Sequence, residues 1–274
     1  MKYFAYFLIA LVLAIVIYHV YRKNFKMMLT PSVCLITGGV KCGKSLLSVM
    51  CSVKDYLKRH HIWWFKTHIF KKYCEEPLFY TNTTISFGSI NSKIPHKLDK
   101  NIVYITKEHL LRDYRFNYGS VIYINESSLL ADNMDYNNQE RNVKLSLFNK
   151  LIGHETRGGA IYYDTQSPLD NHYSLKRVCS TYFFIHKNLN FWLFRVLYVR
   201  EMINTENGVN NFTDDVETST RKVLVFRWWY KKYDRYEFSY LTDDLDKDNK
   251  PFKNKQGLVS FNPLYIKFAD RRKK

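Results

Sequence analysis

Eight consecutive residues, GGVKCGKS, have the types and spacing that bind the phosphates of a nucleotide. They fit the pattern G-x-x-x-x-G-K-[ST] and lie between a short apolar run and an expected helix. Backbone N–H groups can surround phosphate oxygens here, and the helix start adds partial positive charge. Lys44 would reach the β and γ oxygens of ATP, and Ser45 would coordinate Mg²⁺. The predicted nucleotide-binding residues are Gly38, Gly39, Val40, Lys41, Cys42, Gly43, Lys44 and Ser45. Gly39 could instead be purely structural, and Lys41 and Cys42 could point outward.

A second polar pair, Asn125 and Glu126, follows the apolar run VIYI. Parallel sheets place their chemistry at the carboxyl ends of strands, and a phosphate-binding loop needs an acidic residue there to order Mg²⁺ and water. We predict that Glu126 polarises the attacking water and that Asn125 takes the metal position. Asn125 stands where an aspartate is expected, and its neutral amide would weaken Mg²⁺ binding or slow turnover. Glu126 could alternatively cap the next helix.

Further candidates are one glutamine and three arginines. Gln166 ends the expected strand at 160–165 and could reach the γ-phosphate, although an ordinary loop position explains it too. Arg157 is a candidate catalytic arginine, together with Arg141 and Arg177, if subunits pack as a ring. Taken singly, each arginine could be a solvated base.

The segment Tyr3 to Tyr21 contains no acidic or permanently basic side chain. As a helix it is long enough to cross a hydrocarbon core of ~30 Å, so we predict a single-pass transmembrane anchor. A cleavable signal peptide is the alternative, but no small-x-small site follows the apolar run. Arg22, Lys23 and Lys26 come directly after it, which favours a cytoplasmic location for the rest of the chain.

The remaining pattern alternates short strands with helices. Strands are expected at 33–37, 78–84, 101–106, 121–125, 160–165 and 181–186, and helices at 45–57 and 138–154. This alternation predicts an α/β fold, a mostly parallel sheet with flanking helices. Residues 59–76, dense in bases and aromatics, are expected to be an insertion or a partner-facing surface.

We divide the chain into four parts. The predicted parts are an anchor with a basic juncture at 1–29, an ATPase core at 30–190, a β-rich extension at 191–245 and a basic flexible tail at 246–274.

Composition adds two expectations. Forty-two Lys and Arg against 25 Asp and Glu give a net charge of +17, which indicates an anionic neighbour, either nucleic acid or an acidic membrane face. Part of this positive excess could serve only to orient the predicted anchor in the membrane, since basic residues favour the cytoplasmic side. The five cysteines are dispersed without a C-x-x-C pair, a pattern that suits a reducing compartment.

Beyond the loop, several segments resemble the zonular occludens toxin-like family, which includes assembly ATPases of filamentous phages. The similar segments are FYTNTT at 79–84, VIYINES at 121–127, TRGGAIYYDTQSPLDN at 156–171 and KKYDRYEFS at 231–239. The resemblance covers about residues 31–190, with the segment at 231–239 as a later similarity, and implies a P-loop ATPase fold. Two features depart from it: many phage members carry the membrane span after the ATPase domain, and Asn125 replaces the acid.

The resemblance implies an oligomeric ATPase in the host bacterial membrane that drives assembly and export of a filamentous, single-stranded DNA phage. Its implied partners are phage coat or export proteins, and single-stranded DNA is a further candidate partner. Abundant Lys, Asn, Tyr and Phe would suit a plectrovirus-like phage with an AT-rich genome. Two alternatives stay open: a DNA-translocating ATPase of conjugation or segregation type, and a nucleotide-switched membrane scaffold that does not hydrolyse ATP.

Overall fold

The computed structural model describes residues 2–25, 28, 32–105, 116–127, 159–166, 179, 181–203, 216–234, 252–253 and 259–260. The helix expected at 138–154 lies outside these residues, as do Arg141, Arg157 and Arg177.

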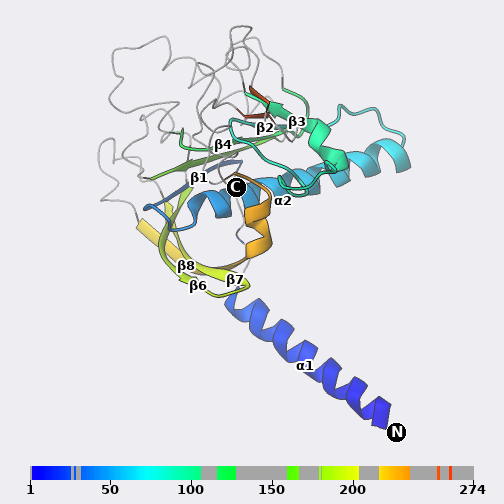
Figure 1. Cartoon of the computed structure of the whole chain (residues 1–274), viewed down its shortest axis with the longest axis vertical. Coiled ribbons are helices and arrows are strands. Elements are labelled where there is room, and N and C mark those ends of the chain that lie inside the picture. The colour runs from blue at the N-terminus through cyan, green and yellow to red at the C-terminus, as the bar shows by residue number, and fades with distance from the viewer. Residues whose placement is uncertain are drawn as a thin grey trace.

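Within the described part of the chain, eight strands form one sheet in the order β3-β2-β4-β5-β1-β6-β7-β8 (Figure 1). The strands are β1 Val33–Gly38, β2 Phe79–Thr81, β3 Ile102–Tyr104, β4 Val121–Ile124, β5 Ala160–Thr165, β6 Thr181–Asn190, β7 Phe194–Ile203 and β8 Val216–Phe226. From β3 to β6 all neighbours are parallel, whereas β6, β7 and β8 pair antiparallel. The mostly parallel α/β sheet predicted from the sequence is confirmed.

β1 lies near the middle of this sheet, and all six of its residues are buried. Side chains of a strand point alternately to the two faces, so successive residues of β1 enter different cores. Cys34 and Ile36 belong to the core beneath α2, and Val33 and Leu35 to the core on the opposite face. Burial on both faces explains why the strand reads as a continuous apolar run.

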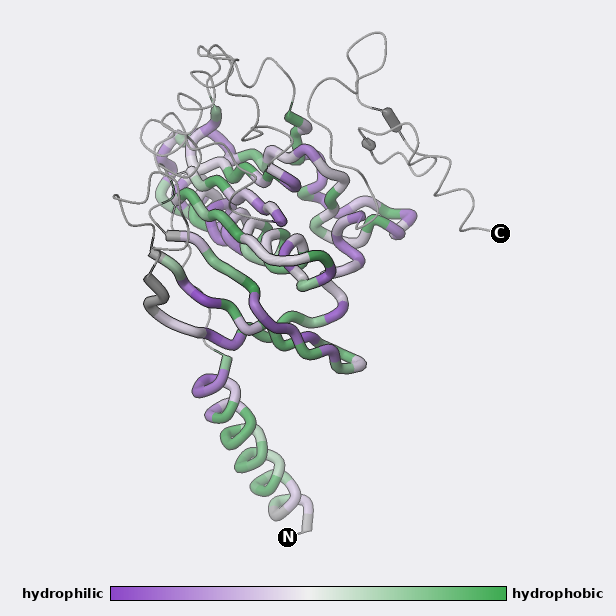
Figure 2. Tube along the Cα trace, turned by 90° about the vertical axis from the view of Figure 1, so that its left-hand side faces the viewer, coloured by the Kyte–Doolittle hydropathy of each residue, from purple (hydrophilic) through white to green (hydrophobic). Residues whose placement is uncertain are grey.

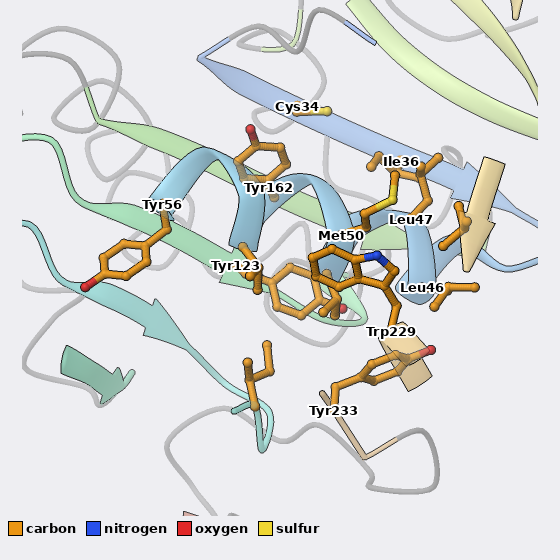
Figure 3. Close-up of a cluster of buried hydrophobic side chains, with 14 of the residues drawn as sticks. Cys34, Ile36, Leu46, Leu47, Met50, Tyr56, Tyr123, Tyr162, Trp229 and Tyr233 are labelled. Atoms are coloured by element: carbon orange, nitrogen blue, oxygen red, sulfur yellow. The ribbon is translucent and has the colours of Figure 1, made fainter. Parts of the chain in front are cut away.

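Helix α2, Lys44–Trp64, covers one face of the sheet. Leu46, Leu47, Val49 and Val53 are almost fully buried there, and burial of each such side chain contributes roughly 1.5–3 kcal/mol. Figure 3 shows α2 side chains packed against residues of the sheet and against Trp229. The sequence predicted a helix ending at Leu57, but α2 continues through the bases and aromatics that follow.

Three short helical turns also occur in the described part of the chain. They are η1 Phe65–Ile69, η2 Lys97–Asn101 and η8 Arg227–Lys231. η1 is a π-helical turn that extends α2, so the first part of the segment expected as an insertion, residues 59–69, is helical.

The β-rich region beyond residue 190 joins the same sheet. Leu197, Val199, Val223 and Val225 pack in the core beneath α2, together with Trp229. The division at residue 190 stays a prediction, but β7 and β8 share a core with the strands before it. Two further strands, β9 Phe252–Lys253 and β10 Val259–Ser260, pair antiparallel within the segment predicted as a tail.

Helix α1, Lys2–Asn24, projects from the body and is largely apolar along its length (Figure 2). In the described part of the chain it is the one helix long and apolar enough to cross a membrane, over Tyr6–Asn24. Its last turn carries Arg22 and Lys23.

Candidate nucleotide-binding site

The loop between β1 and α2 has a backbone that depends on glycine. Gly38 has φ +155° and Gly43 has φ +102°, conformations that side chains rarely adopt. A Cβ on Gly38 would lie 2.6 Å from Cys42 Sγ, and one on Gly43 would lie 3.0 Å from Leu197 Cδ2. The Cys42 N–H donates to the Gly39 carbonyl at 3.2 Å and closes the turn. The loop therefore wraps tightly at both ends.

The first turn of α2 follows this loop and carries Lys44 but no acidic residue. Its unpaired N–H groups and helix dipole leave a partial positive charge that favours an anion. Burial raises the pKa of the neighbouring Cys42 thiol, an effect larger than the opposing influence of Lys44. The helix start is thus suited to phosphate, and Cys42 stays a neutral thiol at neutral pH.

An asparagine on β6 supports the loop from its far side. Asn188 Nδ2 donates to the Cys42 carbonyl at 3.0 Å and to the Lys41 carbonyl at 3.3 Å. The sequence analysis did not single out Asn188, and a polar residue in a half-exposed strand gives no signal for this role. The antiparallel part of the sheet therefore helps to fix the phosphate loop.

The loop meets the carboxyl end of β4. Lys44 Nζ lies 2.5 Å from Glu126 Oε1, with the two side chains 9% and 28% exposed. Ser45 Oγ donates to Asn125 Oδ1 at 3.4 Å. The structure thus brings together four residues that the sequence proposed as a site. β5 lies between β1 and β4, so the acid comes from the second strand along rather than the adjacent one.

Asp164 is a site residue that the sequence analysis missed. It is fully buried on β5 and accepts hydrogen bonds from the Glu126 N–H at 2.7 Å and from Tyr123 OH at 3.0 Å. Burial raises the pKa of Asp164 to about 6, although Lys44 and these hydrogen bonds oppose the shift. An acidic residue inside the run AIYYDT was the available signal.

Glu126 adopts φ +52°, in the left-handed region that non-glycine residues seldom visit. The hydrogen bond to Asp164 fixes its backbone from one side. Its neighbour Asn125 is fixed by Asn82 at the end of β2: the Asn125 N–H donates to Asn82 Oδ1 at 2.8 Å, and Asn82 Nδ2 donates to the Asn125 carbonyl at 3.0 Å. Asn82 lies in the segment FYTNTT and was not predicted as a site residue.

Gln166 follows β5 and has an exposed side chain. It lies at the end of the strand that adjoins β1, on the same edge of the sheet as the loop. The role of Gln166 stays a prediction, and so does that of Arg157, which lies outside the described residues.

A G-x-x-x-x-G-K-S loop thus joins a central parallel strand to a helix, with its lysine paired to an acid from another strand. The chain has the fold of a P-loop NTPase. No family model matches the chain, and no curated protein matches it.

Solved structures with similarity to this P-loop NTPase include the N-terminal domain of zonular occludens toxin from Neisseria meningitidis, as the sequence resemblance led us to expect. That match has 19% identity and a TM-score of 0.43, and covers 75% of this chain and 100% of that one. The genome packaging NTPase B204 from Sulfolobus turreted icosahedral virus 2, in complex with ATP-gammaS, matches at 10% identity and a TM-score of 0.32, over 63% of this chain and 98% of that one. The flagellar accessory protein FlaH from Methanocaldococcus jannaschii matches at 15% identity and a TM-score of 0.36, over 72% of this chain and 90% of that one.

The residues present fit Mg²⁺ and ATP. Oxygen ligands suit Mg²⁺, and the Ser45 hydroxyl and the Asn125 amide oxygen lie close enough to face one cation. Lys44 is largely buried at the helix start, where it can face phosphate oxygens. Glu126 and the buried Asp164 bring acidic groups to the same edge.

Proposed function

We propose that this protein is a membrane-anchored ATPase that powers assembly and export of a filamentous, single-stranded DNA phage through the host cell membrane. The observation that carries the ATPase part is the meeting of the loop with β4, where Lys44 contacts Glu126 and Ser45 contacts Asn125. The assembly role is supported by the sequence resemblance to the zonular occludens toxin-like family.

Each residue has a proposed task in hydrolysis. The loop N–H groups and Lys44 bind the β- and γ-phosphates, and Ser45 and Asn125 would hold Mg²⁺. Bound Mg²⁺ would neutralise phosphate charge. Glu126, released from Lys44 when the lysine turns to phosphate, accepts a proton from the attacking water. Gln166 orients that water or senses the γ-phosphate.

Asp164 compensates for the neutral side chain of Asn125. An aspartate expected beside Glu126 is absent, but a carboxylate lies one strand away and hydrogen-bonds to the Glu126 N–H. Tyr123 OH links the two positions, since it donates to Asp164 Oδ2 at 3.0 Å and lies 3.4 Å from Asn125 Oδ1. This network supports a hydrolysing enzyme over a nucleotide-switched scaffold.

The proposed anchor is α1, with Arg22 and Lys23 at its cytoplasmic end and the nucleotide site in the compartment that contains ATP. Subunits would assemble around the exit site, and Arg157 would reach the nucleotide of a neighbouring subunit.

A groove along α2 and η1 supports contact with the phage DNA. It is lined by Lys54, Leu57, Lys58, His61, Ile62, Phe65, Lys66 and Phe70. Lysines beside exposed aromatic rings can hold a single strand through its phosphates and stacked bases. The same groove favours the second candidate, a DNA-translocating ATPase. Hydrolysis stimulated by single-stranded DNA without coat protein would support that candidate.

Nucleotide binding by Lys44→Ala tests the site. The variant loses a charge-assisted hydrogen bond worth about 1.5–3 kcal/mol, so its ATP affinity should fall roughly 10- to 100-fold. Binding of a fluorescent ATP analogue to full-length protein in phospholipid vesicles measures this. Lys93→Ala, at an exposed position outside the loop, is the matched control and should bind like wild type. Equal affinity of all three proteins would refute the site.

A further inference from the structure

The turn between β6 and β7 presents two large apolar side chains to solvent. The Phe191 N–H donates to the Phe194 carbonyl at 2.9 Å, which closes a tight turn around Trp192 and Leu193. Their exposed fractions are 82% and 59%. Two-residue hairpin turns usually contain Asn, Asp or Gly, so neither side chain is there for the geometry of the turn.

Aromatic residues from a second segment extend this apolar area. Phe191 and Phe194 have ring centroids 4.8 Å apart, and the ring centroids of Phe226 and Trp228 are 5.3 Å apart. The Arg227 N–H donates to the Leu193 carbonyl at 2.9 Å and ties the two segments together. We name the exposed residues Phe191, Trp192, Leu193, Phe226 and Trp228 the hairpin-tip surface.

Basic residues flank the hairpin-tip surface. Lys187, Lys222 and Arg227 are exposed, and residues 187–195 and 222–232 contain no acidic side chain. Tryptophan and other apolar groups beside lysine and arginine are typical of surfaces that enter the head-group region of an anionic bilayer. The positive charge beside the hairpin-tip surface therefore favours an anionic lipid surface as its partner over a protein surface without acidic groups.

The position of the hairpin agrees with this chemistry. In Figures 1 and 2, two views related by a 90° turn, the joined ends of β6 and β7 lie at the end of the body from which α1 projects. Arg22 and Lys23 mark that end of α1. A bilayer spanned by α1 would thus have its surface near the hairpin.

We propose that the hairpin-tip surface inserts into the head-group region of the anionic membrane that α1 spans, as a second membrane contact. This rests on the proposed anchoring by α1. The contact would fix the tilt of the sheet against the membrane, which one spanning helix alone does not. Because Asn188 on β6 also holds the phosphate loop, the same strand connects the membrane surface with the nucleotide site.

Photo-crosslinking to lipid tests the contact. Full-length protein carrying p-benzoylphenylalanine in place of Trp192, Leu11 or Tyr73 is reconstituted into radiolabelled phosphatidylglycerol and phosphatidylcholine vesicles and irradiated. Leu11 lies in α1 and reports the anchor, and Tyr73, 94% exposed beyond η1, is the aromatic control. We expect lipid adducts at Leu11 and at Trp192, the latter several-fold above Tyr73 and reduced in vesicles of phosphatidylcholine alone.

The outcomes separate the two proposals. Adducts at Leu11, with Trp192 no higher than Tyr73, would overturn the second contact and leave the anchor standing. Crosslinks from Trp192 to protein instead of lipid would also overturn it and would identify a protein interface. Adducts at Trp192 but none at Leu11 would refute the anchor, and with it the hairpin as a second contact on a membrane that α1 spans.

Discussion

Lys44 and Glu126 bring opposite charges to the mouth of the loop, and Asp164 lies buried behind them. The sequence predicted the first two from their motif and strand positions. It did not predict Asp164, Asn82 or Asn188, because each acts through hydrogen bonds to backbone groups that are distant in sequence. Such roles depend on which strands become neighbours, and only Asp164 gave a local signal, as an acid within an apolar run.

Alanine substitutions at the two adjacent glycines of the loop should have very different effects on ATP affinity. Gly38→Ala places a Cβ 2.6 Å from Cys42 Sγ at φ +155°, strain that costs roughly 1–3 kcal/mol, so the loop must distort and ATP affinity should fall roughly 5- to 100-fold. A Cβ added at Gly39 would meet no heavy atom within 4 Å, so Gly39→Ala should bind ATP nearly as wild type does. Isothermal titration with ATP measures both. Similar affinities for the two variants would contradict the described loop geometry.

At the scale of elements, strands β1, β4 and β5 match their predicted positions because each is a short apolar run with a polar end. α2 is longer than predicted. Its second half is aromatic and basic and shows no clear helical period in the sequence, yet it continues the helix of the first half. The order of strands was not predictable, since the insertion of β5 between β1 and β4 reflects long-range pairing. Nor did the sequence indicate that β7 and β8 extend the same sheet.

β5 lies between β4 and β1 and carries the buried carboxyl group of Asp164, so the stability of the fold should depend on pH. The pKa of Asp164 is about 6 in the folded protein against an ordinary value of 3.8, so the folded state binds more protons between these values. The contribution of Asp164 to stability is therefore present below about pH 4 and is lost as pH rises through about 6.

Asp164→Asn removes this titration. The free energy of unfolding of the variant, minus that of wild type, should increase by roughly 2.5 kcal/mol between pH 4 and pH 7, given about 1.4 kcal/mol per pKa unit. Denaturant unfolding of detergent-solubilised protein at several pH values measures it. A difference that stays constant over this range would show that Asp164 does not have a raised pKa.

At the scale of the whole molecule, an apolar helix, a nucleotide loop and an aromatic hairpin are arranged around one sheet. The sequence predicted the helix and the loop, since both are continuous segments with strong local signals. The hairpin-tip surface was not predicted, because its two segments are brought together only by the pairing of β7 with β8. The proposed function as a membrane-anchored ATPase would use all three: the helix as anchor, the hairpin to set a tilt and the loop to bind ATP.

Steady-state ATP hydrolysis by Glu126→Gln tests the central claim most directly. The glutamine is nearly isosteric but cannot accept the proton of the attacking water, so full-length protein in vesicles should bind ATP as wild type does and hydrolyse it roughly 10²–10⁴-fold more slowly. Wild type should complete many turnovers in the same assay. Turnover by Glu126→Gln at the wild-type rate, or no turnover by wild type, would contradict a hydrolytic site built from the loop and the end of β4.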